Sequence, residues 1–185
     1  GRSESGAEKL EEPTALFFGL IKAYKGLDIL LAALKQARRQ VPDLKLIVAG
    51  EVYGKKERYE HLIRELGLSE AVDARFHYIT DTEVAEVFRR ARVCVLPYKS
   101  ATQSGVIATA YSFQMPVIAS DVGGLSEYIS EEETGLLVPP NNAEALAAAL
   151  IRYFTENLHE RMSASIPSYI EKFSWPKLAG LILEV

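Results

Sequence analysis

Residues 93–118 constrain the fold of this chain more than any other stretch. An apolar run at 93–96 is followed by a polar loop, a helical pattern that begins near Ser104, and a second apolar run that opens at 116–118. Strand, helix and strand in this order are typical of a βαβ unit, because parallel neighbours need a helical crossover. The stretch therefore predicts a parallel sheet that is buried on both faces.

The loop inside this unit has the composition of an anion-binding site. Residues 99–105 read Lys-Ser-Ala-Thr-Gln-Ser-Gly, so small hydroxyl and amide side chains and a glycine precede the helix. Backbone N–H groups in the first turn of a helix have no intrahelical acceptor, and they bind phosphate readily. We therefore interpret this segment as a phosphate-binding loop.

The rest of the chain alternates between strand and helix patterns. Further apolar runs predict strands at 16–18, 44–49, 74–79 and 135–138. Amphipathic spacings between them predict helices, two of which have cap-like entries at Thr80 and at 141–142. The predicted fold class is α/β: a doubly wound, mostly parallel, Rossmann-like three-layer sandwich.

Ligands of such sheets lie beyond the carboxyl ends of the strands. Those ends carry Gly19, Gly50 and the loops at 98–105 and 121–124. We therefore expect these four glycine-bearing loops to meet in one crevice.

Charge and cysteine usage exclude several classes. The formal net charge of −4 argues against a general nucleic-acid-binding surface. The short basic clusters at 55–56 and 89–92 are interpreted as solvated helix faces. The single cysteine, Cys94, lies in an apolar run and is predicted to be a core residue, which fits the reducing cytoplasm. No apolar run reaches the roughly 18 residues of a membrane span.

Five segments, in order, resemble one known family. They read FFGLIKAYKGLDILL, LKLIVAGE, VCVLPY, MPVIASDVGGLSEYI and TGLLVPPNNAEALAAAL. Together they resemble the C-terminal, donor-binding domain of retaining glycosyltransferases of the GT-B type, one half of that fold. The resemblance implies transfer of a sugar from a nucleoside diphosphate sugar to a glycan or lipid-linked acceptor, with no metal or other cofactor. It also implies an N-terminal domain that carries the acceptor site.

The same resemblance assigns candidate roles to loop residues. Lys25 stands where the family's lysine neutralises the donor diphosphate. The candidates for diphosphate binding are Gly19, Lys25, Gln103, Ser104, Gly105 and Val106. The candidates for contact with the ribose or the base are Gly50, Tyr78, Ile79 and Thr109.

Three positions depart from the family pattern. The arginine that follows the first-strand glycine is replaced by Leu20, although Lys22 is close in sequence. The family's pair of glutamates falls at Ala101 and Thr109, so neither carboxylate is present. Thr109 retains a hydroxyl for hydrogen bonding, whereas the side chain of Ala101 has no such group.

Two hypotheses about function remain open. One is the donor-binding domain of an active glycosyltransferase, supported by the ordered segments and Lys25. The other is a non-catalytic binding or scaffold module that has lost the glutamate pair. A dinucleotide-dependent oxidoreductase is disfavoured, because no GxGxxG motif follows the first strand.

The expected organisation has three parts. Residues 1–13 are interpreted as a leader or linker, 14–160 as the nucleotide-sugar-binding domain, and 161–185 as a helical tail that packs on the N-terminal domain in the family. Because this domain is not in the chain, we expect residues 168–185 to pack poorly or to adopt alternative positions. The resemblance also leaves room for a peripheral membrane association of the full-length enzyme.

Several residues outside the loops are predicted to have structural rather than functional roles. His61 and His159 are predicted at the surface, and His77 as a half-buried strand residue. Glu127 either complements a helix dipole or makes a structural contact across the donor loop. Trp175 is expected to pack in the closing helix.

Overall fold

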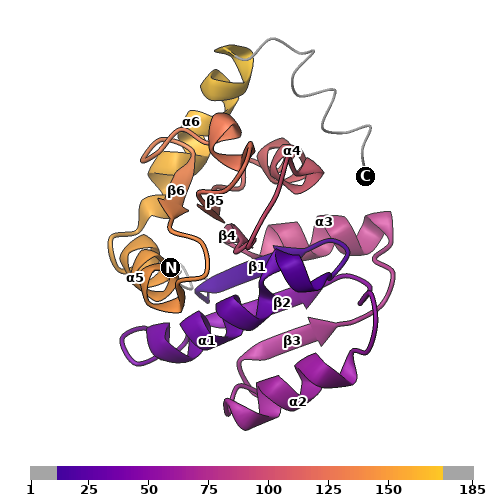
Figure 1. Ribbon diagram of the computed structural model, residues 1–185. Helices are drawn as coiled ribbons and strands as arrows, with labels where there is room; N and C mark the ends of the chain where they lie inside the picture. Colours follow the sequence, from indigo (N-terminus) through magenta and orange to yellow (C-terminus); the bar gives the residue numbers. More distant parts are fainter. Residues whose placement is uncertain (1–11, 173–185) are drawn as a thin grey trace, which may run out of the picture.

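A computed structural model describes residues 12–172, which are built around one parallel sheet (Figure 1). Within these residues, the six strands have the order β3-β2-β1-β4-β5-β6, and each neighbouring pair is parallel. The strands are β1 (Thr14–Phe18), β2 (Lys45–Ala49), β3 (Val72–Arg75), β4 (Val93–Leu96), β5 (Val117–Ser120) and β6 (Gly135–Val138). The predicted doubly wound α/β class is thereby confirmed.

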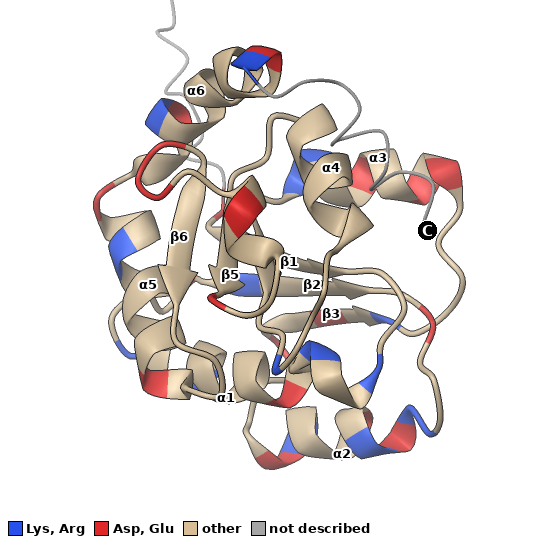
Figure 2. Cartoon of the chain, turned by 45° about the horizontal axis from the view of Figure 1, so that its top comes forward, with Lys and Arg blue, Asp and Glu red and all other residues tan. Residues whose placement is uncertain are grey.

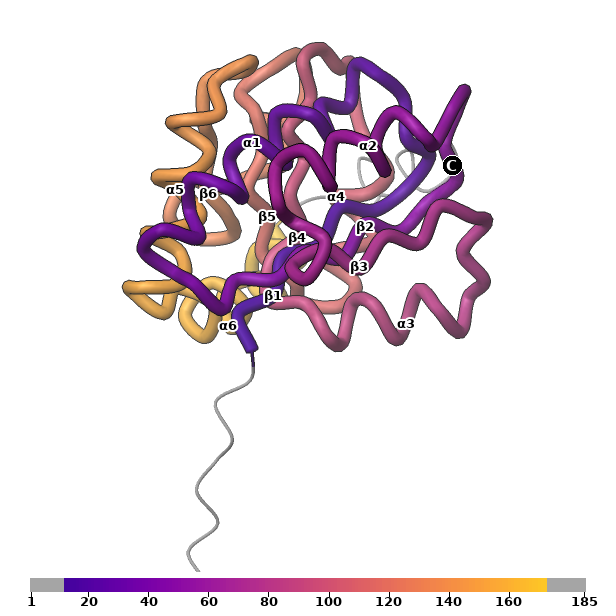
Figure 3. The backbone as a smooth tube through the Cα atoms, turned by 90° about the horizontal axis from the view of Figure 1, so that it is seen from below, coloured from indigo at the N-terminus to yellow at the C-terminus, as the bar shows by residue number. Residues whose placement is uncertain are grey.

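Helices connect the strands and cover both faces of the sheet. They are α1 (Leu27–Ala37), α2 (Glu57–Glu65), α3 (Asp81–Arg90), α4 (Gly105–Ser112), α5 (Ala143–Thr155) and α6 (Leu158–Lys172), with short 3-10 helices η1 (Ala23–Lys25) and η2 (Leu125–Tyr128). The core on one face includes side chains of α1, α2 and α5, and the core on the other includes side chains of α3 and α4. Figure 3 shows the strands between α1 and α3, as the middle of three layers.

Alternation along β4 explains why its four residues are all apolar. Val93 and Val95 belong to the core beneath α1 and α5, whereas Cys94 and Leu96 belong to the core beneath α3 and α4. Successive side chains of a strand point to opposite faces, so a central strand of a covered sheet needs apolar residues at every position. Cys94 is fully buried, and this burial raises the pKa of its thiol to about 12. Its predicted role as a core residue is confirmed.

The helix caps lie where the sequence predicts them. Thr80 forms a capping box with Glu83: the Glu83 N–H donates to Thr80 Oγ1, and the Glu83 carboxylate accepts from the Thr80 N–H. Asn142 Oδ1 accepts from the Ala145 N–H, 2.8 Å away, at the start of α5. These side chains satisfy N–H groups that a helix leaves without partners at its first turn.

The third strand differs from the prediction. It spans Val72–Arg75 rather than 74–79, and the chain leaves the sheet at Phe76, whose ring lies 6.3 Å from that of Tyr59. The apolar signal at 76–79 therefore reflects packing outside the sheet. β3 is an edge strand, where polar residues are tolerated, and Arg75 there pairs with Glu86 at 2.9 Å.

Two histidine predictions were wrong. His77 lies beyond the end of β3 with 55% of its side chain exposed, and its Nε2 is 2.8 Å from Glu83 Oε1. His159 is partly buried, with Nδ1 2.8 Å from the Arg92 carbonyl oxygen, and burial lowers the pKa of its ring. The third, His61, is exposed as predicted.

Helix α6 passes from one core to the other. Leu158 and Met162 pack into the first core, and Ile166 packs into the second. Tyr169 is partly buried, and its ring meets that of Tyr111 edge-on at 5.9 Å. Of the 168–185 segment the structure describes only residues 168–172, in which no side chain is fully buried and Tyr169 and Ile170 pack partly buried against the second core. The expectation of poor packing therefore stays a prediction for the rest of the segment, and Trp175 lies outside the described residues.

The surface mixes both charge signs. Lys and Arg segments are interspersed with Asp and Glu segments over the helices (Figure 2). The predicted basic clusters include the exposed residues Lys55, Lys56 and Arg89, in keeping with solvated faces. Between residues 12 and 172, no helix combines the length and apolar character needed to cross a membrane.

Candidate anion-binding site

The site lies where the winding of the sheet reverses, between β1 and β4. From β1 the chain continues through α1 to β2, and from β4 it continues through α4 to β5 on the other side (Figure 1). The loops 19–26 and 97–104 therefore diverge from adjacent strands. At such a switch point, parallel sheets form a crevice beyond the carboxyl ends of their strands.

The two loops are in direct contact. The Lys99 N–H donates to the Tyr24 carbonyl oxygen over 2.7 Å, and the Tyr24 ring meets the Tyr98 ring edge-on at 6.2 Å. Gly26 has φ +71°, and a Cβ built on it would stand 1.9 Å from the Pro97 carbonyl oxygen. Only glycine allows this approach together with this backbone conformation. The position of η1, and of Lys25 at its end, depends on this contact.

Lys25 lies beside the groups with which it was predicted to act. A Cβ built on Gly19 would stand 3.5 Å from Lys25 Nζ and 3.4 Å from Val106 Cγ2. The structure thus brings together residues from the end of β1, from η1 and from the first turn of α4. Lys25 Nζ also lies 5.5 Å from the centre of the Tyr98 ring, in cation–π geometry.

Among the described residues, no carboxylate compensates the ammonium of Lys25. Within residues 12–172 it forms no ion pair, while burial, and next the charge of Lys22, lower its pKa from the ordinary lysine value. A partly buried cation is costly unless a counter-charge is supplied. The geometry therefore creates a position where a bound anion would be stabilised.

The first turn of α4 approaches the same place through Val106, beside Gly19. Ser104 caps the helix: its Oγ accepts from the Val106 N–H over 3.3 Å and lies 3.3 Å from the Tyr98 hydroxyl. Gly105 is the first residue of α4, and Gln103 is exposed just before it. The N–H groups and dipole of the first helical turn favour negative charge here.

Gly50 supports the site through the backbone of β1. A Cβ on Gly50 would stand 2.0 Å from the Gly19 carbonyl oxygen, and the Gly19 N–H donates to Ala49 O over 3.0 Å. This packing explains the glycine at the end of β2. Its predicted contact with a ribose or base remains a prediction.

A third loop, which follows β5, closes over the loop after β4. The Gly124 N–H donates to the Thr102 carbonyl oxygen over 3.0 Å, and a Cβ on Gly123 would stand 1.5 Å from the Ala101 carbonyl oxygen. The sequence shows the glycine pair, but it does not show that the pair packs against the backbone of Ala101 and Thr102. The fold alone shows that both glycines are needed for loop packing.

The other predicted residues are placed differently. The Thr109 hydroxyl donates to the Gly105 carbonyl oxygen over 3.2 Å within α4, and Tyr78 is 74% exposed on the loop after β3. Ile79 packs against the core beneath α3. Because β2 separates β3 from β1, Tyr78 and Ile79 are set apart from Lys25 by one strand. Tyr98, which the sequence analysis did not select, contacts Lys25 directly.

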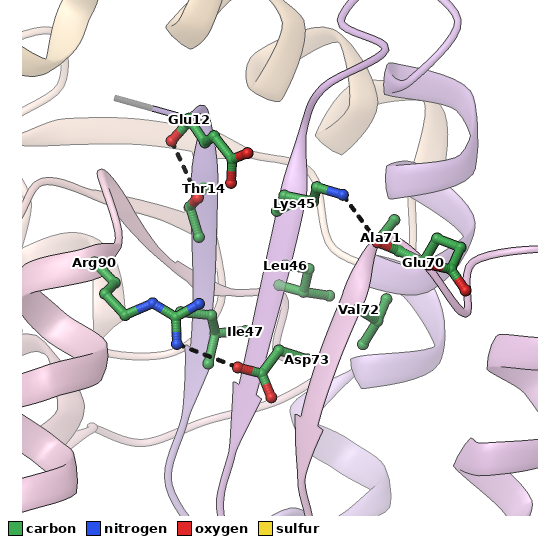
Figure 4. Close-up of a pocket in the computed structure, with 10 residues that line it drawn as sticks. All are labelled: Glu12, Thr14, Lys45, Leu46, Ile47, Glu70, Ala71, Val72, Asp73 and Arg90. Carbon is green, nitrogen blue, oxygen red and sulfur yellow. Dashed lines mark hydrogen bonds and ion pairs between the residues drawn. The ribbon is translucent and has the colours of Figure 1, made fainter. Parts of the chain in front are cut away.

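Two hollows lie at the opposite, amino-terminal edge of the sheet. One, of about 230 Å³, is bordered by Lys45, Asp73 and Arg90 (Figure 4). Lys45 Nζ donates to the Glu70 carbonyl oxygen over 2.9 Å, and Arg90 pairs with Asp73 at 3.4 Å. The other, of about 760 Å³, includes His159 in its lining. Among residues 12–172, no cluster of three or more His, Cys, Asp or Glu side chains is arranged to hold a metal ion.

Comparison with known proteins identifies the family. The profile of the family described as "Glycosyl transferases group 1" matches residues 2–168. The chain belongs to the group 1 glycosyltransferases. This finding confirms the resemblance on which the site was predicted, and it agrees with the GT-B type of fold.

Individual proteins are also similar to this chain. The D-inositol 3-phosphate glycosyltransferase of Paenarthrobacter aurescens is 32% identical over 173 residues, which cover 91% of this chain and 42% of that enzyme. The structure of sucrose-phosphate synthase from Thermosynechococcus elongatus matches with a TM-score of 0.80 and 30% identity, over 94% of this chain and 44% of that one. Anabaena HepE in complex with UDP-glucose matches with a TM-score of 0.76 and 19% identity, over 92% and 47%. The chain thus spans less than half the length of these relatives.

Proposed function

We propose that this chain is the donor-binding domain of a retaining glycosyltransferase that moves a hexose or similar sugar onto a glycan or lipid-linked acceptor. The donor is a nucleoside diphosphate sugar. Its diphosphate binds between Lys25 and the loop 103–106. The base and ribose extend toward Gly50, Thr109 and the loop that holds Tyr78 and Ile79.

The placement of Lys25 is the observation that carries this proposal. Its ammonium is partly buried, lacks an ion-pair partner among the described residues, and lies near Val106 in the first turn of α4. A cation and a helix N-terminus on two sides of one position suit a diphosphate. During transfer, the leaving diphosphate gains negative charge, which fixed positive groups stabilise without reorganisation.

Known proteins support the proposal at the level of fold and family. Anabaena HepE, with a similar fold, has been crystallised with UDP and with UDP-glucose. Several relatives at 30–32% identity are D-inositol 3-phosphate glycosyltransferases. These names describe the activity of the relatives, and the proposal takes from them only the class of reaction.

We further propose a division of labour between two domains in the cytoplasm. An N-terminal domain supplies the acceptor site and the other half of the cleft, and any membrane association of the full-length enzyme is peripheral. Transfer depends on holding donor and acceptor together away from water. The isolated chain is therefore expected to bind the donor but not to transfer its sugar. We propose a reaction in which no metal takes part, with Lys25 and α4 offsetting the phosphate charge.

The non-catalytic module remains the second candidate, on one specific observation. At the two glutamate positions, Ala101 has no polar side-chain atom and the Thr109 hydroxyl already donates within α4. A protein that keeps the phosphate-binding groups but lacks both carboxylates would bind the donor without transferring its sugar, unless another residue replaces those carboxylates. Transfer by the full-length protein distinguishes the two candidates.

Calorimetric titration of the chain with UDP, GDP, ADP and the corresponding glucose conjugates tests the binding proposal. Saturable binding of at least one nucleoside diphosphate is expected, together with no labelled sugar transferred to any acceptor by the isolated chain. Lack of binding by the entire panel would refute the donor-binding function. Transfer by the isolated chain would refute the division between two domains.

A further inference from the structure

A second lysine at the switch point is already neutralised. Lys99 Nζ lies 2.8 Å from Asp28 Oδ2, and 32% and 30% of the two side chains are exposed. Lys99 belongs to the loop after β4, and Asp28 to the first turn of α1. The ion pair therefore bridges the two sides of the crevice.

We propose that Asp28 and Lys99 are positioning residues of the donor site. Their ion pair clamps the β4–α4 loop to the start of α1 and so holds the N-terminus of α4 beside the Lys25 ammonium. Neither residue touches the donor. This inference rests on the proposed function, because it names the device that keeps the two halves of the phosphate site at a fixed separation.

The arrangement of contacts along the loop supports the clamp. Gly26 abuts the Pro97 carbonyl oxygen, and the Lys99 N–H donates to the Tyr24 carbonyl oxygen over 2.7 Å. The residues that follow, Ser100, Thr102 and Gln103, differ from Lys99 in being exposed. Lys99 is thus tied to the β1–α1 side through both its backbone and its side chain, just before the loop turns toward α4.

The charges of the ion pair also support a positioning role rather than a role in binding phosphate. Asp28 compensates Lys99 but forms no ion pair with Lys25, so the uncompensated charge remains on Lys25. If Lys99 were instead a reserve phosphate ligand, releasing it from Asp28 would add a cation and strengthen anion binding. A clamp predicts the opposite result, because releasing Lys99 loosens the loop that leads to Ser104.

Binding measurements on paired substitutions test the proposal. Asp28→Asn and Lys99→Met are each expected to weaken UDP binding by about threefold to tenfold in calorimetry, and the double variant should be no weaker than the worse single variant. Lys99→Arg, which keeps the ion pair, should restore affinity to within about twofold of the unmodified chain. Lys35→Met is the matched control, because Lys35 is exposed in the last turn of α1. Additive losses, or a gain of affinity in Asp28→Asn, would overturn the clamp.

Hydrogen exchange of the ligand-free chain gives a readout that does not depend on UDP. In Asp28→Asn, the Lys99 amide and the segment 99–104 should exchange faster, while β1 and β2 should keep their protection. Unchanged exchange in both single variants would overturn the clamp. If the unmodified chain binds none of UDP, GDP and ADP, the proposed function fails, and the exchange rates then decide the positioning role on their own; if it binds GDP or ADP instead of UDP, that nucleotide replaces UDP in the titrations.

Discussion

Replacing Lys25 by methionine is expected to separate donor binding from folding. Methionine keeps an unbranched stem of similar length beside Gly19 and the Tyr98 ring, but it removes the charge. The change should therefore weaken binding of a nucleoside diphosphate. It should leave binding of the free nucleoside almost unaltered, since the nucleoside has no phosphate for Lys25 to contact.

The size of the effect follows from the surroundings of Lys25. Its ammonium is partly buried and has no ion-pair partner among residues 12–172, so no carboxylate in this part of the chain competes for it. A hydrogen bond to a charged group contributes about 1.5–3 kcal/mol. At about 1.4 kcal/mol per factor of ten, the dissociation constant for UDP should rise by about tenfold to 150-fold.

The same substitution should not lower the unfolding free energy of the ligand-free chain. Burial lowers the pKa of Lys25, which means that the folded state disfavours the charged form relative to the unfolded chain. Removing the charge should therefore maintain or raise the midpoint of urea unfolding. Calorimetry with UDP and uridine, together with urea titration, measures both effects, and Lys35→Met is the control for a general loss of positive charge.

Two results would refute this reasoning. Equal losses of affinity for UDP and uridine would place Lys25 outside the phosphate site. A large fall in unfolding free energy would show that the ammonium is satisfied in the ligand-free fold, contrary to the absence of an ion pair among the described residues.

Three further outcomes are expected. Gly26→Ala should lower the unfolding free energy by more than about 1 kcal/mol in urea titration, because its Cβ would stand 1.9 Å from the Pro97 carbonyl oxygen at positive φ; an unchanged midpoint would contradict the close approach. Tyr111→Phe should cost about 1–3 kcal/mol by the same assay, since its buried hydroxyl is 2.8 Å from Thr134 Oγ1, and a neutral effect would show that this bond is dispensable. The pKa of Lys25 is lower in the folded chain than the ordinary lysine value, so between these two pH values the unfolded chain binds more protons at this residue. In that pH range, the contribution of Lys25 to the unfolding free energy of the ligand-free chain should therefore rise with pH. The difference between the pH profiles of the unmodified chain and Lys25→Met isolates this contribution, and a difference of the opposite sign would contradict it.

Much of the fold is predictable from local sequence because its signals are short-range. Alternation and apolar runs depend on neighbouring residues, so β4, β5 and β6 lie close to their predicted positions. The caps at Thr80 and Asn142 act within three residues of themselves. The edge strand β3 escaped this reasoning, because its polar residues resemble a loop, whereas Phe76 and Ile79 pack outside the sheet.

The candidate site was predictable in part. Lys25 and the loop at 103–106 were selected from family-like segments, and the structure places Lys25 near Val106. Tyr98 was missed, since a tyrosine after an apolar strand carries no local sign that a lysine will lie over its ring. His159 was misjudged for a similar reason: its polar neighbours in sequence suggest a surface, but its ring contacts the carbonyl group of Arg92.

Local residue patterns account for the alternation of strands and helices, for the glycines that such turns require, and for one lysine and one capped helix that suit an anion. Their arrangement beside one another comes from contacts between distant parts of the chain. Lys25 and Val106 are far apart along the chain, yet both come to lie beside Gly19, because β1 and β4 pair while their crossovers run in opposite directions. That meeting depends on long-range pairing and on the contact of Gly26 with Pro97, neither of which is encoded in any single stretch of residues.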